Sequence, residues 1–384
     1  MIVCYLAAIC PQKYYYNIEN EISIAAYQFN SLLMHGFASI DSIDVRCVVP
    51  FSLLRRLETN ELGQMVEEGK IKYYIFDETV VRAGYYKYVL ETIKKIKEWE
   101  RKDKVVIITD ALGISVDIVS TIARMFCNNV TVGIVTDLPQ YVINTDSLRG
   151  KLRCNLNLLL MKKFDKYILL TKQMEEQINK KHRPQCIVEG VCNFQTIENG
   201  NSQGKYKKKV CMYAGSLHKE YGIDMLIQAF IRADVENSEL HIYGNGNYSR
   251  EVEDICKKYS NILYFGQRGH EEILKEEKKA WLLINPRPTT AEYTKYSFPS
   301  KTLEYMASGT PVLMTCLPGM PEDYKEHVYL FEDESIDGYA KKIKEVLLQE
   351  KGLEEKGIKA KDFILKTRNN KIQAERIAKE LELL

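Results

Sequence analysis

The chain has 384 residues, of which 45% are hydrophobic and 28% charged, and this composition indicates a globular protein and excludes a disordered one. The length suffices for two domains of ordinary size, and a net charge of +2 gives no argument for nucleic acid as a partner. No apolar stretch approaches the ~20 residues that cross a bilayer, so no membrane span is expected.

The ten cysteines are scattered, with no C-x-x-C pair and no Cys/His cluster at zinc spacing. We therefore expect reduced, mostly buried thiols in a cytoplasmic protein. The first ten residues, MIVCYLAAIC, lack a basic start and precede Pro11, so they predict a strand rather than a signal peptide. No D-x-D pair is present to hold a divalent metal, and we expect no metal site.

The first half of the chain alternates short apolar runs with helical patterns. The runs predict strands at Ile2–Ile9, Val45–Val49, Lys72–Phe76, Val105–Thr109, Val130–Val135, Lys166–Leu170 and Cys186–Val188. Helical spacing marks Ile22–Leu33, Tyr86–Glu98 and Val116–Phe126 between them. Such alternation predicts an α/β domain with a doubly wound parallel sheet.

Thr136 and Asp137 follow the predicted strand at 130–135. Asp137 could orient a hydroxyl group or accept its proton, which makes it the candidate catalytic residue. It could equally begin a turn and bond the backbone next to Pro139. The sequence leaves both interpretations open.

The stretch 148–163, LRGKLRCNLNLLLMKK, has leucines at helical spacing surrounded by basic residues. The leucines are Leu148, Leu152, Leu156, Leu159 and Leu160, and the basic residues are Arg149, Lys151, Arg153, Lys162 and Lys163. Basic amphipathic helices can lie on anionic membranes, so peripheral contact with the inner face of a membrane is one interpretation. We favour a core-facing helix, because a buried stripe by itself explains the leucines.

The polar, Gly/Asn-rich stretch Gln195–Lys208 has no periodicity and predicts a domain boundary, with one domain at 1–194 and a second at 195–356. A second α/β series follows, with strands predicted at Val210–Ala214, Leu240–Tyr243, Ile262–Phe265, Trp281–Ile284, Val312–Met314 and Val328–Phe331. The stretch 357–384 has a helical pattern.

Two turns of the second series contain glycines at strand ends. After the strand at 210–214 comes a short loop with Gly215, Ser216 and Lys219, then an apolar helix. After Leu240–Tyr243, the sequence GNGNYS departs from the dinucleotide-binding fingerprint at its third glycine, so we predict a tight turn with Ser249 as helix cap.

The most informative stretch is 285–311, NPRPTTAEYTKYSFPSKTLEYMASGTP. A polar loop leads to Pro299, which favours a helix start, and the helix is predicted to end at Gly309. The free N–H groups at such a start favour an anion, and Glu304, one turn later, could accept two hydrogen bonds from a ribose. These features predict a nucleotide site. The alternative is an ordinary strand–loop–helix with solvated cations.

The candidate donor-site residues of this stretch share the loop or the first helical turns, and they are Arg287, Lys295, Tyr296, Ser297, Phe298, Ser300, Lys301 and Glu304. The stretch resembles the donor-site signature of family-four GT-B glycosyltransferases. In that signature a Glu, a Gly-Phe-Gly turn and a second Glu eight positions after the first precede Ala-Met-Ala-x-Gly-x-Pro-Val. Glu304 matches the second Glu and Phe298 the Phe, whereas Tyr296 stands in place of the first Glu.

Met212–Phe230 resembles the family's pattern Gly-Arg-Leu-x-x-x-Lys-Gly, with Gly215 matching. The basic pair of that pattern is replaced by Ser216 and Tyr221, and Lys219 could supply a substitute cation. Many relatives have His-Asp where this chain has Thr136-Asp137.

The resemblance implies the GT-B fold, two doubly wound, Rossmann-like domains facing across a cleft, with 357–384 packing back on the first. It also implies a retaining, metal-independent glycosyltransferase without a cofactor. The donor would be a nucleotide-diphosphate sugar, with UDP or GDP as the expected nucleotide. The acceptor would be a sugar, glycan or lipid-linked hydroxyl in glycan, polysaccharide or glycolipid biosynthesis. By this resemblance Glu304 holds the donor ribose and the loop backbone holds the diphosphate.

Two other functions stay open, the first of them because the first Glu and the basic pair are missing. One is a non-catalytic subunit that binds a sugar nucleotide, and the other is an enzyme resembling nucleotide-sugar epimerases.

Overall fold

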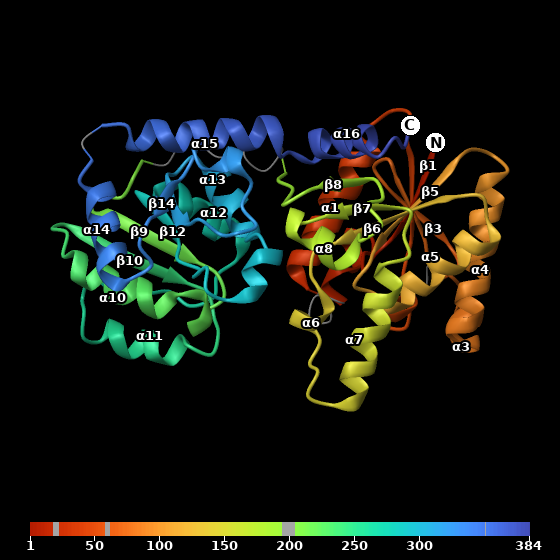
Figure 1. The fold of residues 1–384 in the computed structure, drawn as a ribbon, viewed down its shortest axis with the longest axis horizontal. Coiled ribbons are helices and arrows are strands. Elements are labelled where there is room, and N and C mark those ends of the chain that lie inside the picture. The colour runs from red at the N-terminus through yellow and green to blue at the C-terminus, as the bar shows by residue number, and fades with distance from the viewer. Residues whose placement is uncertain (18–22, 58–61, 194–203, 350) are drawn as a thin grey trace. The chain divides into compact units, whose positions relative to one another are not determined.

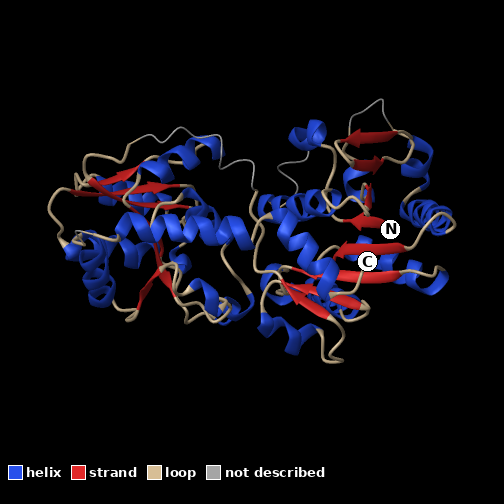
Figure 2. Ribbon diagram, turned by 90° about the horizontal axis from the view of Figure 1, so that it is seen from above, coloured by secondary structure: helices blue, strands red, loops and turns tan. Residues whose placement is uncertain are grey.

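The computed structural model describes residues 1–17, 23–57, 62–193, 204–349 and 351–384, which form two compact α/β units (Figure 1). The first unit comprises Met1–Val191 and Asn370–Leu384, and the second comprises Cys192–Asn369. In Figure 2 each unit is a sheet with helices packed against its faces. The boundary predicted between 194 and 195 falls on residues outside the described ranges.

The first unit contains an eight-stranded sheet in the order β3-β4-β2-β1-β5-β6-β7-β8. Its strands are β1 Ile2–Leu6, β2 Asp44–Val48, β3 Met65–Glu68, β4 Ile71–Tyr74, β5 Val105–Asp110, β6 Val130–Val135, β7 Lys166–Leu169 and β8 Gln185–Ile187. All seven predicted strands are present. The strand β3 was not predicted, and it alone in this sheet pairs antiparallel, at the edge. The central strands β1 and β5 are buried on both faces, as expected for a parallel sheet.

Helices and short helical turns connect these strands. They are η1 Gln12–Asn17, α1 Ile24–Ala38, α2 Phe51–Leu54, α3 Glu78–Ala83, α4 Tyr85–Glu100, α5 Ile114–Phe126, α6 Pro139–Val142, α7 Leu148–Met161, η2 Lys172–Met174 and α8 Glu175–Ile178. The last helix of the chain, α16 (Asn370–Glu380), also belongs to this unit and packs on α1. A Cβ at Gly36 of α1 would lie 2.1 Å from the Asn370 carbonyl oxygen, so glycine permits this close approach.

The second unit contains a six-stranded parallel sheet in the order β11-β10-β9-β12-β13-β14. Its strands are β9 Lys209–Ala214, β10 Ser238–Tyr243, β11 Ile262–Tyr264, β12 Leu282–Asn285, β13 Val312–Thr315 and β14 Tyr329–Phe331. Every strand lies within two residues of its predicted bounds, because each is a short buried apolar run bounded by turn residues.

The helical elements of the second unit are η3 Lys219–Tyr221, α10 Ile223–Ala233, α11 Ser249–Cys256, α12 His270–Lys279, η4 Glu292–Tyr296, α13 Ser300–Ser308, η5 Glu322–Tyr324, α14 Ile336–Leu347 and α15 Leu353–Thr367. The C-terminal helical stretch is divided at Asn369: α15 lies in the second unit, and only α16 lies in the first.

The favoured interpretation of the leucine stripe in α7 was wrong. Leu148, Leu152, Leu156 and Leu159 are 81%, 71%, 45% and 54% exposed, and only Leu160 of the five is buried. The face of α7 that packs on the sheet carries Cys154, Asn157, Leu160 and Met161 instead. An amphipathic pattern gives the spacing of a stripe but not the side on which the protein lies.

Candidate functional site

The candidate donor-site residues lie at the carboxyl edge of the six-stranded sheet, where ligands bind in open α/β sheets. The connections that follow β9, β11 and β12 begin at this edge and contain the residues of the candidate site. The strand β12 pairs with β9, so their following loops, 215–222 and 286–299, emerge side by side. Gly222, with φ +82°, fixes their close approach, because a Cβ there would lie 2.2 Å from the Pro286 carbonyl oxygen.

Glu304 lies on α13, one turn after the helix start, and is mostly buried. Its carboxylate is ion-paired with Lys301 on the same helix, and the His270 Nδ1 at the start of α12 lies 3.6 Å from its Oε2. Burial opposes ionisation, but the Lys301 ammonium, a hydrogen bond with Glu277 and the nearby His270 together outweigh it and lower the pKa of Glu304 below its ordinary value. Glu304 is therefore a charged hydrogen-bond acceptor at neutral pH.

Glu277 on α12 is a site residue that the sequence prediction missed. Its side chain is fully buried, and its carboxyl group is within hydrogen-bonding reach of the Glu304 carboxylate. Burial and the Glu304 charge raise the pKa of Glu277 well above its ordinary value, which favours the neutral form of this carboxyl group. A signal was available: Glu277 lies four residues after buried Ile273 and three before buried Ala280, on the apolar stripe of its helix.

Arg287 follows β12, and its guanidinium carbon lies 4.6 Å from the ring centroid of Tyr221 and 6.0 Å from that of Tyr293. Thr315 Oγ1 donates a 2.5 Å hydrogen bond to the Arg287 carbonyl and fixes its backbone. Within the described ranges, no carboxylate lies at ion-pair distance from this guanidinium. Arg287 is thus a half-buried cation held by aromatic rings, with its N–H donors available to an anion.

The other predicted donor-site residues occupy the same loops in different ways. Gly215 and Ser216 form the turn after β9, where Tyr213 donates a 2.9 Å hydrogen bond to the Ser216 carbonyl oxygen. Lys219 is exposed on η3. Phe298 is buried and packs against Tyr324, with ring centroids 5.0 Å apart, so its side chain belongs to the core.

The remaining predicted donor-site residues lie in the loop before α13 and at the start of that helix. Lys295 is exposed and Tyr296 buried on η4, and Ser300 is the exposed first residue of α13. The hydroxyl oxygens of Ser297 and Tyr293 are buried and have no hydrogen-bond partner among the described residues. Because buried hydroxyl groups normally have partners, these two are candidates to bond a ligand in this loop.

Asp137 lies in the first unit, at the carboxyl edge of the eight-stranded sheet, and is half-buried after β6. The sequence prediction missed its neighbour Asp110, which ends the adjacent strand β5. Burial, together with the charge of Asp137, raises the pKa of Asp110 to about 6. Asn30 Nδ2 donates a 3.0 Å hydrogen bond to Asp110. A strand that ends in Asp was the signal, as it was for Asp137.

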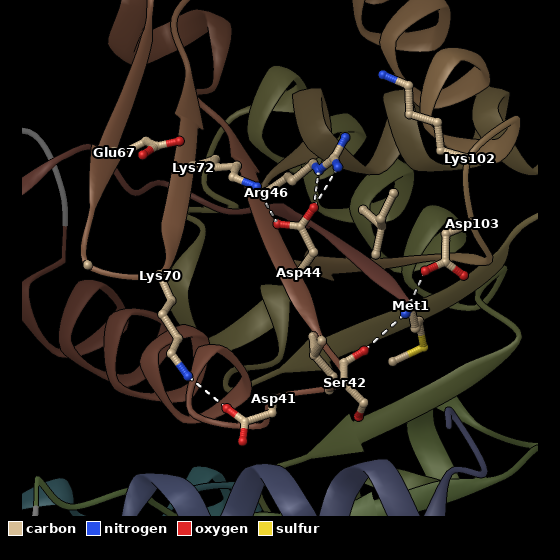
Figure 3. Close-up of a pocket in the computed structure, with 13 residues that line it drawn as sticks. Met1, Asp41, Ser42, Asp44, Arg46, Glu67, Lys70, Lys72, Lys102 and Asp103 are labelled. Atoms are coloured by element: carbon tan, nitrogen blue, oxygen red, sulfur yellow. Dashed lines mark hydrogen bonds and ion pairs between the residues drawn. The ribbon is translucent and has the colours of Figure 1, made fainter.

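A hollow in the first unit lies at the opposite, amino-terminal ends of β1, β2 and β4 (Figure 3). Its charges pair with one another: Arg46 and Lys72 with Asp44, at 2.5 and 3.1 Å, and the N-terminal amine with Asp103, at 2.8 Å. Since its charges are compensated and it lies away from the carboxyl edge, this hollow is not the candidate site.

Comparison with known proteins bears on the second unit most directly. Residues 195–364 match the protein family described as glycosyl transferases group 1. A stretch of 125 residues, 32% of this chain, is 27% identical to an uncharacterized glycosyltransferase of Methanocaldococcus jannaschii. That stretch spans 30% of the relative's length.

Solved structures share the fold over the whole chain. Sucrose-phosphate synthase from Thermosynechococcus elongatus aligns with a TM-score of 0.67 at 15% identity, over 100% of this chain and 99% of its own. HepE of Anabaena, solved with UDP, aligns with 0.66 at 12% identity over 100% of both chains. The lipopolysaccharide outer core galactosyltransferase WaaB aligns with 0.63 at 13% identity, over 100% and 99%. At these identities the likeness establishes the fold alone, and that fold is GT-B.

Proposed function

Because residues 195–364 match the glycosyl transferases group 1 family and the chain has the GT-B fold, we propose that it transfers a sugar from a nucleotide-diphosphate donor to an acceptor hydroxyl group. One observation carries the proposal. The carboxyl edge of the second sheet presents a charged carboxylate, Glu304, and a fixed cation, Arg287, that has no carboxylate at ion-pair distance among the described residues. The hydroxyl groups of a ribose can donate hydrogen bonds to the Glu304 carboxylate, and a diphosphate can accept hydrogen bonds from the Arg287 guanidinium.

In the proposed complex each residue has a separate role. Glu304 accepts hydrogen bonds from the ribose hydroxyls, and Lys301 keeps Glu304 ionised. The diphosphate lies against Arg287 and the first backbone N–H groups of α13, which no side chain caps. The resemblance to HepE, which was solved with UDP and with UDP-glucose, makes UDP the first nucleotide to test.

The proposed reaction is the departure of the nucleoside diphosphate and attack by the acceptor oxygen with retention at the anomeric carbon. Negative charge develops on the leaving diphosphate, and stabilising it should be the largest catalytic contribution of the protein. Arg287 and the α13 amides would supply that stabilisation, so we propose that transfer proceeds without a divalent metal. In the first unit, Asp137 would orient the acceptor hydroxyl or take its proton, with Asp110 beside it.

Isothermal titration with UDP, GDP and ADP, in EDTA, tests the donor site on wild type and on Glu304→Gln and Arg287→Gln. We expect one nucleotide to bind, and each substitution to weaken it about 10- to 100-fold, because a hydrogen bond to a charged group contributes about 1.5–3 kcal/mol. The matched control is Glu345→Gln, which removes another Lys–Glu pair of i,i+3 spacing in the second unit, Lys342–Glu345 at 3.1 Å. This control should bind like wild type.

Product analysis with the matching sugar nucleotide then separates the alternatives. Release of nucleoside diphosphate that depends on an added acceptor supports transfer. Binding without any conversion of the sugar nucleotide would point to a binding subunit, and conversion without an acceptor would point to an epimerase-like activity. Nucleotide affinity that survives both Glu304→Gln and Arg287→Gln would contradict the site itself.

A further inference from the structure

The helix α7 exposes an apolar stripe that its own packing does not use. Leu148, Leu152, Leu156 and Leu159 are spaced four, four and three residues apart and lie on one face of the helix. The opposite face holds the helix in place. There, buried Asn157 donates from Nδ2 to the carbonyl oxygen of Ala111, at 3.4 Å, and to Asp117 Oδ2, at 3.3 Å. The four exposed leucines are therefore not needed to hold α7 in place.

Basic residues flank this stripe on both sides. Arg149 and Arg153 lie along one flank, Lys151 and Lys162 along the other, and all four are exposed. No Asp or Glu occurs between Ser147 and Phe164. An apolar stripe between two rows of cations is the arrangement that inserts leucines among acyl chains while the basic side chains reach lipid phosphates.

Helices that neighbour α7 also carry exposed apolar side chains. The end of α5 lies beside α7, since Arg124 donates a 2.5 Å hydrogen bond to the Lys163 carbonyl, and its last residue, Phe126, is 62% exposed. Val142 of α6, which contacts α7, is 50% exposed. In Figure 1 the N-terminal half of α7, drawn in yellow, extends beyond the neighbouring helices of the first unit. Exposed apolar surface of this kind marks an interaction site in soluble domains.

We propose that this face of α7 binds the surface of an anionic lipid bilayer. The positive charge of this face distinguishes between possible binding partners. A second copy of the stripe would place cations opposite cations, whereas anionic lipid headgroups would complement them. Among the described residues no helix is long and apolar enough to cross a bilayer, so the contact is peripheral. The proposal concerns a surface in the first unit and does not depend on the donor site.

The test is flotation of the full chain with two kinds of vesicles, pure phosphatidylcholine and equal parts phosphatidylcholine and phosphatidylglycerol. We expect binding to the anionic vesicles only. The double variant Leu148→Ser/Leu152→Ser should lose at least about tenfold in binding, since each leucine would otherwise bury apolar area. The triple variant Arg149→Gln/Lys151→Gln/Arg153→Gln should lose about fivefold per charge, and added salt should have the same effect.

Matched controls remove exposed side chains of the same kinds elsewhere. They are Leu348→Ser/Ile358→Ser, at sites 52% exposed, and Lys257→Gln/Lys359→Gln/Lys366→Gln, at sites 67–74% exposed. Both should bind like wild type. An independent readout is Leu156→Trp, whose indole emission should shift to the blue with anionic vesicles and not with neutral ones.

Three results would overturn the proposal. The first is equal binding to both vesicle types. The second is anionic binding that the leucine variant leaves unchanged. The third is a concentration-dependent dimer, without vesicles, that the leucine variant dissociates, because the stripe would then be a contact between copies of this chain.

Discussion

Two neighbouring glutamates of the second unit have pKa values shifted in opposite directions. The pKa of Glu304, beside Lys301, is lowered, and that of Glu277, fully buried on the neighbouring helix, is raised well above its ordinary value. The groups that bear on Glu277 are Glu304, whose charge opposes its ionisation, and Lys301, which favours it. Tyr305 also lies within its electrostatic reach. The neutral form of Glu277 avoids a second buried charge next to the proposed ribose ligand.

This arrangement predicts that Glu277 lowers stability as the pH rises. Below its ordinary pKa of 4.5, both the folded and the unfolded chain hold the proton. Above that value the unfolded chain releases it, while the folded chain retains it up to the raised folded pKa, so the free energy of unfolding falls through this window. The substitution Glu277→Gln should therefore raise the melting temperature more at about pH 8 than at about pH 5. The gain amounts to at most about 1.4 kcal/mol per pH unit within the window.

The control is Glu276→Gln, because the pKa of Glu276 is shifted in the opposite direction to that of Glu277. Burial opposes ionisation of Glu276, but hydrogen bonds from Lys279 and Tyr206 outweigh it and lower its pKa. Its contribution is present above its ordinary pKa of 4.5 and is lost as the pH falls through the lowered one, so Glu276→Gln should lower the melting temperature by a similar amount at about pH 8 and about pH 5, and by less at about pH 3. Equal melting shifts for Glu277→Gln at about pH 5 and about pH 8 would contradict a raised pKa of Glu277.

Among the elements, the turn between β10 and α11 shows how backbone geometry fixes the wall of the candidate site. Gly244 has φ +127°, and a Cβ there would lie 1.8 Å from the Gly215 carbonyl oxygen, in the loop after β9. Ser249 was predicted as the helix cap. It is instead the first residue of α11, and its hydroxyl accepts a 2.9 Å hydrogen bond from the Gly246 N–H. The predicted tight turn is present.

A strained backbone conformation typically costs about 1–3 kcal/mol. We expect Gly244→Ala to destabilise the second unit by more than this, because the added Cβ would also clash with the Gly215 carbonyl oxygen. Urea unfolding monitored by Trp281, in a Trp99→Phe background, measures this. Gly266→Ala is the control: it shares a positive φ, +68°, but its Cβ would meet no atom within 4 Å. It should cost only about 1–2 kcal/mol. Equal losses for the two variants would show that the Gly215 contact does not matter.

At the scale of the whole molecule, the chain returns to its first unit at the end. The helix α16 packs on α1, and Ile377 is fully buried in the first core. Gln373 Nε2 donates a 3.0 Å hydrogen bond to the Gly190 carbonyl oxygen, and Arg376 Nη2 donates one of 2.5 Å to that of Ile187. These contacts join α16 to the strand β8 and the segment that follows it, so α16 is part of the first unit.

Ile377→Ala should lower the stability of the first unit by about 2–5 kcal/mol through the cavity it leaves. The stability of the second unit should be unaffected. Each unit has its own tryptophan reporter, Trp99 in the first and Trp281 in the second, so urea unfolding of single-tryptophan variants separates the two. Lys371→Ala, which removes an exposed side chain of the same helix, should leave both transitions unchanged. A shift of the Trp281 transition alone in Ile377→Ala would contradict this assignment.

The sequence by itself determined the features that depend on neighbours along the chain. Buried strands appear as short apolar runs between turn residues, so both sheets could be predicted. Only the edge strand β3 was missed, because its MVEE sequence is not an apolar run, although turns at Gly63 and Gly69 bound it. The start of α13 and the place of Glu304 one turn inside it follow from Pro299 and helical spacing in the same way.

Tertiary structure alone decided what depends on residues distant in sequence. Helical spacing is the same whether a stripe faces the core or solvent, so only the packing of Asn157 shows that the leucines of α7 face outward. Likewise, the pKa of Glu277 is raised because folding buries it and brings it beside Glu304, and Arg287 is held by Tyr221, on a separate loop. Burial and Coulomb interactions depend on distances in space, and the order of residues along the chain does not give those distances.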